Sequence, residues 1–480
     1  MTNKEKVELI LSELKSVPDL EIYQKTSDLK RFSKDFFDYS PILINELKDC
    51  LADIVVRPLS VDAIIVVAQM CNRYSTPLTL RGSGTGNYGQ CVPLDGGVVM
   101  VMGGGREIRN FDSKSGEITV EPGCLLRDIN DELIKHGRQL RLLPSTWRSA
   151  SVGGFIAGGS GGIGSVRWGF LRDPGHLHAL EVITTEDSPR KLELNASNSE
   201  ALNHAYGTNG IITALTLSTA PYVEWQQIVV DCFDLDQAVD LLHEFSCAAL
   251  ELYLGTLLEK EIVKCLPSGS GKPSNKHRLL LLVSPDGVST IERLAKSAGA
   301  DFDNLGPENL KAGTGLRELS WNHTTLHMRG IDPAWTYLQM LLPQPELEMM
   351  KKLKSEWGSN LLWHLECVRQ NGVQRLASLP VVKWQGEEAM NQLISQCRDL
   401  GAVIFNPHTI TVEDGGLGVI DSDQVQAKSN FDPKGILNPG KLKGWNIKVN
   451  RFNCFIFKQF NLSIFSFEKG HLLNIVILKL

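Results

Sequence analysis

Two glycine-rich segments contain the residues best suited to holding a ligand through the backbone. The first runs Arg81-Gly82-Ser83-Gly84-Thr85-Gly86-Asn87-Tyr88-Gly89, and the second extends from Pro144 to Gly169. Glycine reaches positive φ at little cost, and successive backbone N–H groups in such loops can bind an anion. Nearly half of the 43 glycines lie between Arg81 and Phe170. The two segments are therefore predicted to wrap the pyrophosphate of a single dinucleotide.

The first segment also contains Gly-x-Gly-x-x-Gly at Gly84, Gly86 and Gly89, which must be tested as a Rossmann fingerprint. That fingerprint needs a strand before it and a helix directly after it. The run 77–80 can supply the strand, but 90–97 contains a proline and a glycine pair and does not continue as a helix. The context argues against a nicotinamide site and favours FAD, while a purely structural glycine loop stays open for this segment alone.

Further motifs occur in an order that resembles one family of flavoproteins. Val120-Glu121-Pro122-Gly123 lies between the two glycine segments, and Gly207-Thr208-Asn209-Gly210-Ile211-Ile212-Thr213 follows them. With these motifs, about residues 50–220 resemble the FAD-binding PCMH-type domain of the vanillyl-alcohol oxidase and p-cresol methylhydroxylase superfamily. The closing run from Phe431 to Leu442 is similar to that of the glycolate oxidase FAD subunit and of D-lactate dehydrogenases.

The resemblance implies that backbone and small side chains of both segments line FAD. The predicted cofactor-binding residues are Arg81, Gly82, Ser83, Gly84, Thr85, Gly86, Asn87, Pro144, Ser145, Thr146, Ser149, Ser151, Val152, Gly153, Gly154, Gly161, Gly162, Gly210, Ile211 and Ile212. Arg81 has two interpretations, a phosphate contact or a salt bridge at the end of a strand. Some relatives tether the flavin to a histidine of the first loop. No histidine stands there in this chain, so the resemblance implies non-covalent FAD.

Several histidines and one arginine are candidates for catalysis. A flavin dehydrogenase that oxidises a CH–OH group must remove the hydroxyl proton, and histidine suits this base because its pKa lies near neutrality. His408 stands where the glycolate and lactate relatives carry a Gly-Glu-His-Gly-like stretch, so the resemblance makes it the first candidate for the base or a substrate ligand. His323 is a further candidate, and Arg329 could bind a carboxylate through two hydrogen bonds. His327 and His364 are secondary, and each of these residues can also be structural.

One departure from the family concerns metal binding. Many D-lactate and glycolate relatives show a Gly-Asp-Gly-Asn-Leu-His stretch with a metal-binding histidine, which this sequence lacks. No metal is therefore expected. The absence of this stretch also weakens the argument for a 2-hydroxy acid substrate. The resemblance still implies an FAD-dependent oxidase or dehydrogenase acting on CH–OH donors, with a glycolate- or lactate-like 2-hydroxy acid favoured. The alternatives are a reductase that uses a pyridine nucleotide and an FAD-binding subunit of an electron-transfer complex.

The patterns of strands and helices place these motifs on an α+β framework. A strand at 53–58, a helix at 61–72 capped by Ser60 and a strand at 77–80 lead into the first glycine segment. The expected organisation is an N-terminal helical segment at 1–48, the FAD-binding domain at 49–221, an α+β (ferredoxin-like) cap or substrate domain at 222–405, a return to the flavin region at 406–445, and an atypical extension at 446–480.

Composition narrows the range of partners. The 49 Lys and Arg against 55 Asp and Glu give a net charge of −6, which argues against a nucleic-acid surface. Ten cysteines without a C-x-x-C pattern suit reduced thiols in a cytoplasm-like compartment. The extension lacks the ~20 apolar residues of a spanning helix, so a poorly ordered tail and a peripheral membrane anchor are its alternatives. A small-molecule substrate is expected, and the electron acceptor, a homo-oligomer and a partner subunit stay open.

Overall fold

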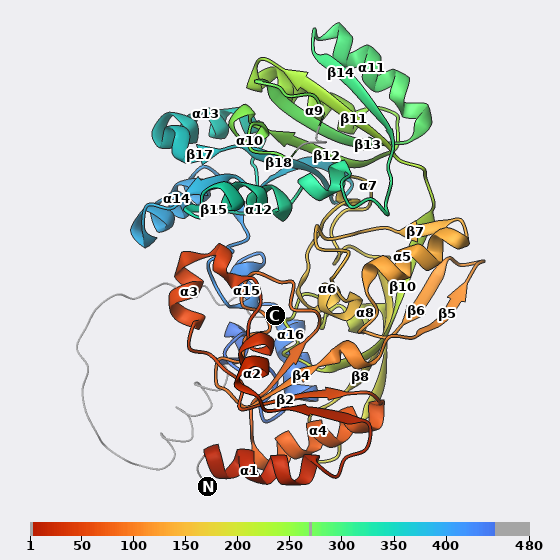
Figure 1. Cartoon of the computed structure of the whole chain (residues 1–480), viewed down its shortest axis with the longest axis vertical. Helices are drawn as coiled ribbons and strands as arrows, with labels where there is room; N and C mark the ends of the chain where they lie inside the picture. The colour runs from red at the N-terminus through yellow and green to blue at the C-terminus, as the bar shows by residue number, and fades with distance from the viewer. Residues whose placement is uncertain (1–2, 268–270, 447–480) are drawn as a thin grey trace, which may run out of the picture.

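The computed structural model describes residues 3–267 and 271–446 of the chain. The fold is α+β, as the sequence predicted, and Figure 1 shows residues 222–405 at the top of the molecule with the glycine-rich part below. Apart from Asn446, the 446–480 extension lies outside the described residues. Within the described residues, no helix is both long enough and apolar enough to cross a membrane.

The first sheet leads directly to the first glycine segment. Its elements are α1 Asn3–Leu14, β1 Leu20–Tyr23, β2 Ile54–Pro58, α4 Val61–Tyr74, β3 Leu78–Arg81 and β4 Val98–Val101, with strand order β1-β2-β4-β3. Ser60 caps α4 by accepting a hydrogen bond from the backbone N of Ala63 at 3.2 Å. The N-terminal segment, expected to be helical, holds α2 Thr26–Phe32 and α3 Pro41–Leu47 but also β1, which pairs antiparallel with β2. Four residues are too few for a strand pattern to stand out.

The second sheet carries the remainder of the glycine-rich part. Its strands are β5 Ile108–Asp112, β6 Glu117–Val120, β7 Arg138–Leu140, β8 Leu177–Ile183, β9 Lys191–Asn195 and β10 Ile211–Pro221, in the order β5-β6-β10-β8-β9 with β7 beside β10. The helices are α5 Leu126–Lys135, α6 Val152–Gly158, α7 Ser165–Trp168 and α8 Ala196–Ser199. The second glycine segment fills the connection between β7 and β8, and the first leaves the end of β3.

Residues 222–405, called the second region below, build their own sheets. The run β11 Gln226–Cys232, α9 Leu235–Cys247, β12 Leu252–Leu258, β13 His277–Val283, α11 Val288–Ser297 and β14 Asp301–Pro307 gives the order β14-β11-β13-β12, with antiparallel neighbours. This is the ferredoxin-like arrangement that was expected.

Further strands and helices extend this unit. The sheet continues through β18 His364–Gln370, β19 Val373–Ser378, β16 Met340–Leu341 and β21 Val403–Ile404, and a small sheet holds β15 Trp335–Tyr337, β20 Val381–Lys383 and β17 Leu361–Leu362. The helices are α10 Lys260–Val263, α12 Asn322–Ile331, α13 Glu346–Trp357 and α14 Glu387–Asp399. Leucine-rich strands such as β13 are buried throughout, so the sheet packs as a core.

The closing run returns to the glycine-rich part. It follows α15 Val412–Gly415 and α16 Ser422–Phe431, which lie with the lower half of the molecule in Figure 1. The Asp432 carboxylate accepts hydrogen bonds from the backbone N of Ile436 at 3.0 Å and of Leu437 at 2.8 Å, and Leu437 bridges Leu78 in parallel. The Asn438 side chain donates to the carbonyl of Gln90 at 2.7 Å. The motif at the end of the chain therefore fixes β3 and the first glycine segment.

Candidate active site

A cavity of about 430 Å³ lies between the glycine segments and the second region. Its volume falls within the range of about 300–1,000 Å³ that is usual for small-molecule and cofactor sites. The walls come from both glycine segments, from loop 204–212, from α12 and the turn before it, and from residues 36 and 39. Residues from at least five separate parts of the chain thus meet at one site.

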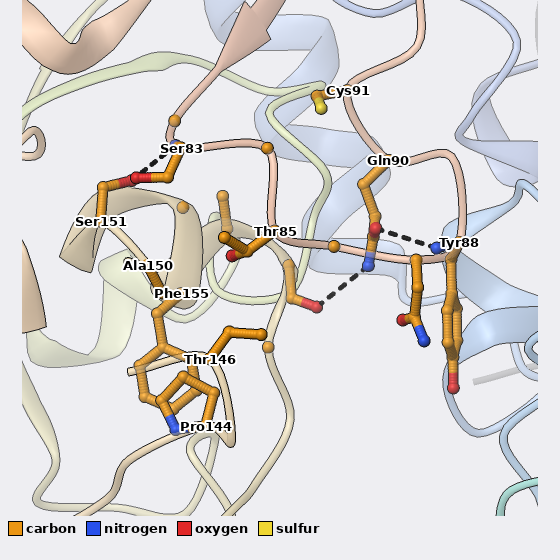
Figure 2. A pocket seen from close by; sticks show the side chains of 18 of the residues that line it. Ser83, Thr85, Tyr88, Gln90, Cys91, Pro144, Thr146, Ala150, Ser151 and Phe155 are labelled. Atoms are coloured by element: carbon orange, nitrogen blue, oxygen red, sulfur yellow. Dashed lines mark hydrogen bonds between the residues drawn. The ribbon is translucent and has the colours of Figure 1, made fainter. Parts of the chain in front are cut away.

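The two glycine segments are packed so closely that no room is left for a side chain at Gly82. The backbone N of Ser83 donates to Ser151 Oγ at 3.2 Å, as Figure 2 shows, and a Cβ on Gly82 would overlap that same oxygen. Gly84 has φ +72°, a conformation that side chains disfavour. Gln90 ties the far end of the loop by accepting from the backbone N of Tyr88 at 3.1 Å. The result is a cradle of main-chain atoms, defined here as residues 82–87, 144–154 and 158–162.

Most of the predicted cofactor-binding residues line this cavity. The lining residues among them are Gly82, Ser83, Gly84, Thr85, Gly86, Asn87, Pro144, Ser145, Thr146, Ser149, Ser151, Gly153, Gly154, Gly161, Gly162, Gly210 and Ile212. Val152 and Ile211 do not line it, because their side chains are in the core. Arg81 is also outside: it is buried and donates to the Lys34 carbonyl at 2.6 Å, which matches neither interpretation offered for it.

Buried charges beneath the first segment support its conformation. Lys441 donates to the Gly89 carbonyl oxygen, and its burial lowers its pKa to about 8. Asp35 accepts from the backbone N of Phe37 at 3.0 Å, and burial raises its pKa to about 6 despite the nearby charges of Lys441 and Arg81. Arg81 therefore packs beneath the first glycine segment, where it donates to the Lys34 carbonyl, and does not reach the cavity.

Two lining residues, His204 and Tyr206, had no signal in the sequence. Both adopt left-handed backbone conformations, with φ of 55° and 53°. His204 Nδ1 lies 3.0 Å from the Gly159 carbonyl oxygen, whereas His204 Nε2 and Tyr206 Oη are buried without a hydrogen-bond partner among the described residues. Buried polar atoms normally have partners, so these two atoms are left for a ligand to satisfy. The main-chain cradle and the two unpaired atoms fit a polar dinucleotide such as FAD.

The three catalytic candidates separate clearly. His408 does not line the cavity: its Nδ1 lies 2.7 Å from Ser40 Oγ, its Nε2 lies 3.0 Å from the Tyr337 carbonyl, and burial lowers its pKa to about 4. Arg329 is also outside, donating to the carbonyls of Asp38 at 2.8 Å and Trp335 at 2.8 Å. The polar atoms of both side chains are engaged in this way, and neither side chain lines the cavity, so the structure does not bring these two expected catalytic residues to it.

His323 is the candidate that lines the cavity. Its Nδ1 lies 3.7 Å from Glu318 Oε2, and burial lowers its pKa, so that the ring is neutral near pH 7. Arg148 donates from Nε to the other oxygen of Glu318 at 2.8 Å and lines the same wall. Arg148 lies in the second glycine segment, between Thr146 and Ser149. It was not predicted, because the motif in this segment indicates backbone groups that bind phosphate. The three side chains form what we call the polar cluster, Arg148–Glu318–His323.

A strained turn carries His323 to the cavity. Trp321, just before α12, has φ +51°, which is unfavourable for a bulky residue. Its backbone N donates to Glu366 Oε1 at 2.6 Å, and the same carboxylate binds Thr256 Oγ1 at 2.6 Å and His364 Nε2 at 2.8 Å. His364 is therefore part of a buried support rather than of the cavity wall. Strain that is held in place in this way is typical of functional sites.

Comparison with known proteins agrees with the cavity's chemistry. Residues 52–191 match the family model described as an FAD binding domain. The chain is 24% identical to D-lactate dehydrogenase of Archaeoglobus fulgidus, over 81% of this chain and 91% of that protein. It is 23% identical to glycolate oxidase subunit GlcD of Bacillus subtilis, over 82% of this chain and 89% of that protein.

The fold also has a solved counterpart. The structure of alkyldihydroxyacetonephosphate synthase superposes with a TM-score of 0.69 at 17% identity, covering 90% of this chain and 85% of that chain. This likeness concerns the fold alone. Together with the relatives above, the cavity identifies the chain as an enzyme, an FAD-linked oxidoreductase that carries a PCMH-type FAD-binding domain.

Proposed function

We propose that this enzyme oxidises the CH–OH group of a 2-hydroxy acid to a 2-oxo acid. The observation that carries the proposal is the polar cluster, which places a neutral histidine and an arginine in the same cavity as the FAD cradle. A base and a carboxylate-binding group are the two side chains that this reaction needs from the protein. The names of the relatives, a D-lactate dehydrogenase and a glycolate oxidase subunit, support the same class of substrate.

In this proposal His323 receives the hydroxyl proton of the substrate. Its lowered pKa keeps the ring unprotonated and able to accept that proton. Glu318, 3.7 Å from Nδ1, then stabilises the imidazolium that forms. The C2–H bond breaks with its electron pair, C2–O becomes a carbonyl, and the product is the 2-oxo acid. FAD, when bound, supplies the two-electron acceptor for the hydride, at flavin N5.

Arg148 binds the substrate carboxylate in this arrangement. Its Nε and Nη2 are held by Glu318 at 2.8 Å and by the Leu310 carbonyl at 2.7 Å, and the guanidinium stacks over Trp147. These contacts leave Nη1 without a hydrogen bond to any described residue. A guanidinium fixed in this way offers a donor to a carboxylate with little loss of side-chain entropy.

An anaerobic substrate panel tests the proposed function. Purified holoprotein is mixed with 2-hydroxy acids, and bleaching of the flavin absorbance band is followed in a stopped-flow instrument. We expect reduction by at least one 2-hydroxy acid, and acid precipitation should release FAD into the supernatant, since no histidine lies in the first loop. Reduction by NADH or NADPH alone would instead support a pyridine-nucleotide-dependent reductase. Reduction only after a partner protein is added would support a subunit of an electron-transfer complex.

A further inference from the structure

Exposed apolar side chains are among the residues that line the cavity, and they come from distant parts of the sequence. Phe36 is 51% exposed and Leu326 is 48% exposed, and both line the cavity together with Tyr39 and Trp321. Single exposed apolar residues are ordinary on a protein surface. Their convergence on the cavity that also contains the polar cluster is what calls for an explanation.

Specific contacts hold this apolar wall in place. We call residues 33–40 the strap; its Phe36 backbone N donates to the Gly86 carbonyl at 2.8 Å, which fixes it to the cradle. At its other end Arg329 of α12 donates to the Asp38 carbonyl at 2.8 Å and stacks over the Tyr39 ring at 5.3 Å. Arg329 thus joins the strap to the helix that carries Leu326. The wall is a built feature that spans the glycine-rich part and the second region.

Polar groups that line the same cavity could bind the polar end of a substrate. Arg148 offers the free Nη1 donor described above. Asn322, at the start of α12, lines the cavity, and its Oδ1 is buried with no hydrogen-bond partner in the described part of the chain. The Arg148 cation, the hydroxyl acceptor His323 and the apolar side chains therefore line the same cavity.

We infer that the substrate is a 2-hydroxy acid with an apolar side chain of about four or more carbons, rather than glycolate or lactate. This inference rests on the proposed function and names its substrate class. Arg148 binds the carboxylate, His323 accepts from the hydroxyl as in the proposed function, and the side chain lies against Phe36 and Leu326. Each methylene buried against an apolar wall strengthens binding by about fourfold. Glycolate and lactate are too short to use that wall.

The test compares acids of increasing length on the full-length holoprotein. The panel holds glycolate and both enantiomers of lactate, 2-hydroxyhexanoate and 3-phenyllactate, with anaerobic flavin reduction as the readout. We expect 2-hydroxyhexanoate or phenyllactate to exceed lactate by at least about 50-fold in the ratio of reduction rate to apparent Kd. A second readout needs no turnover: hexanoate should bind more tightly than acetate, measured by its perturbation of the oxidised flavin spectrum.

Matched variants locate the effect. Leu326→Ser and Phe36→Ser should lower the efficiency with 2-hydroxyhexanoate about tenfold more than that with lactate. Ile331→Ser is the control, since Ile331 is 62% exposed on the same helix and does not line the cavity. Equal efficiency of lactate and 2-hydroxyhexanoate would overturn the inference and leave the proposed function standing, as would an Ile331→Ser variant that shifts the preference as far as Leu326→Ser. Failure of every 2-hydroxy acid to reduce the flavin would overturn the proposed function itself.

Discussion

The cradle and the polar cluster line one cavity and are built in different ways. The cradle consists of main-chain atoms from two nearly continuous segments, and its geometry depends on glycines such as Gly82 and Gly84. The polar cluster consists of side chains from residues 148, 318 and 323, each positioned by contacts from elsewhere. A backbone site tolerates no added volume, whereas a side-chain site depends on a few individual groups. Substitutions in the cradle should therefore remove the cofactor, and substitutions in the polar cluster should remove the reaction.

The largest effect is expected from filling the cradle. Gly84→Val places a branched side chain at φ +72°, where its Cβ would overlap the Arg81 guanidinium. The purified variant should contain essentially no FAD, measured as flavin per protein by absorbance. Gly330→Val is the matched control, because a Cβ at Gly330 meets no atom within 4 Å. A Gly84→Val protein with stoichiometric FAD would remove this loop from the cofactor site.

The next effect is at the polar cluster and should leave FAD in place. His323→Gln removes the proposed base, and such losses slow the chemical step by ~10²–10⁴-fold. Anaerobic stopped-flow reduction, beside the flavin content of the same sample, measures both quantities. His327→Gln is the control, since His327 lies one turn along α12 and does not line the cavity. A His323→Gln enzyme that reduces its flavin within tenfold of the parent rate would show that another group is the base.

A substitution of His408 tests whether this first candidate for the catalytic base has a purely structural role. Its folded pKa of about 4 lies below the ordinary 6.5, so the unfolded chain takes up the proton first and stability falls as the pH drops from 6.5 to 4. The loss amounts to up to about 3 kcal/mol for this group. Urea unfolding at pH 7 and pH 4.5 should show a smaller pH-dependent loss for His408→Gln than for the parent, with near-normal flavin reduction in the folded variant. Slow flavin reduction in His408→Gln, with the pH dependence of its stability unchanged from the parent, would show that His408 has a catalytic role.

The smallest effect is expected at the carboxylate contact. Arg148→Gln should weaken binding of the acid by roughly 10–100-fold, since a hydrogen bond to a charged group contributes about 1.5–3 kcal/mol. The effect should appear in the apparent Kd from reduction kinetics rather than in the limiting rate. Arg148→Lys keeps the charge without the planar fork and should recover part of the affinity. Arg127→Gln, whose side chain is 45% exposed in an ion pair with Asp128, should change neither quantity.

The sequence by itself determined the cradle and the main elements around it. Glycine spacing, the Ser60 cap and the apolar strand patterns are local properties, so β2, α4 and β3 were predicted nearly to their ends. The same motifs predict the cofactor, because a binding site made of main-chain atoms is formed by residues that are consecutive in the sequence. The short strand β1 escaped prediction because its pairing with β2 is a long-range contact.

Only the tertiary structure decided which of these side chains line the cavity. His323 and His408 are the same residue type, but both ring nitrogens of His408 lie within hydrogen-bond distance of Ser40 and Tyr337. Arg148 and Arg329 are likewise the same type, but Arg329 donates to the Asp38 carbonyl of the strap. Arg148 meets Glu318 across 170 residues of sequence, and Glu366 holds the Trp321 turn across 45. No local pattern encodes such distances. A side chain is free for a ligand only when the folded chain leaves it without a partner, and that depends on every element packed around it.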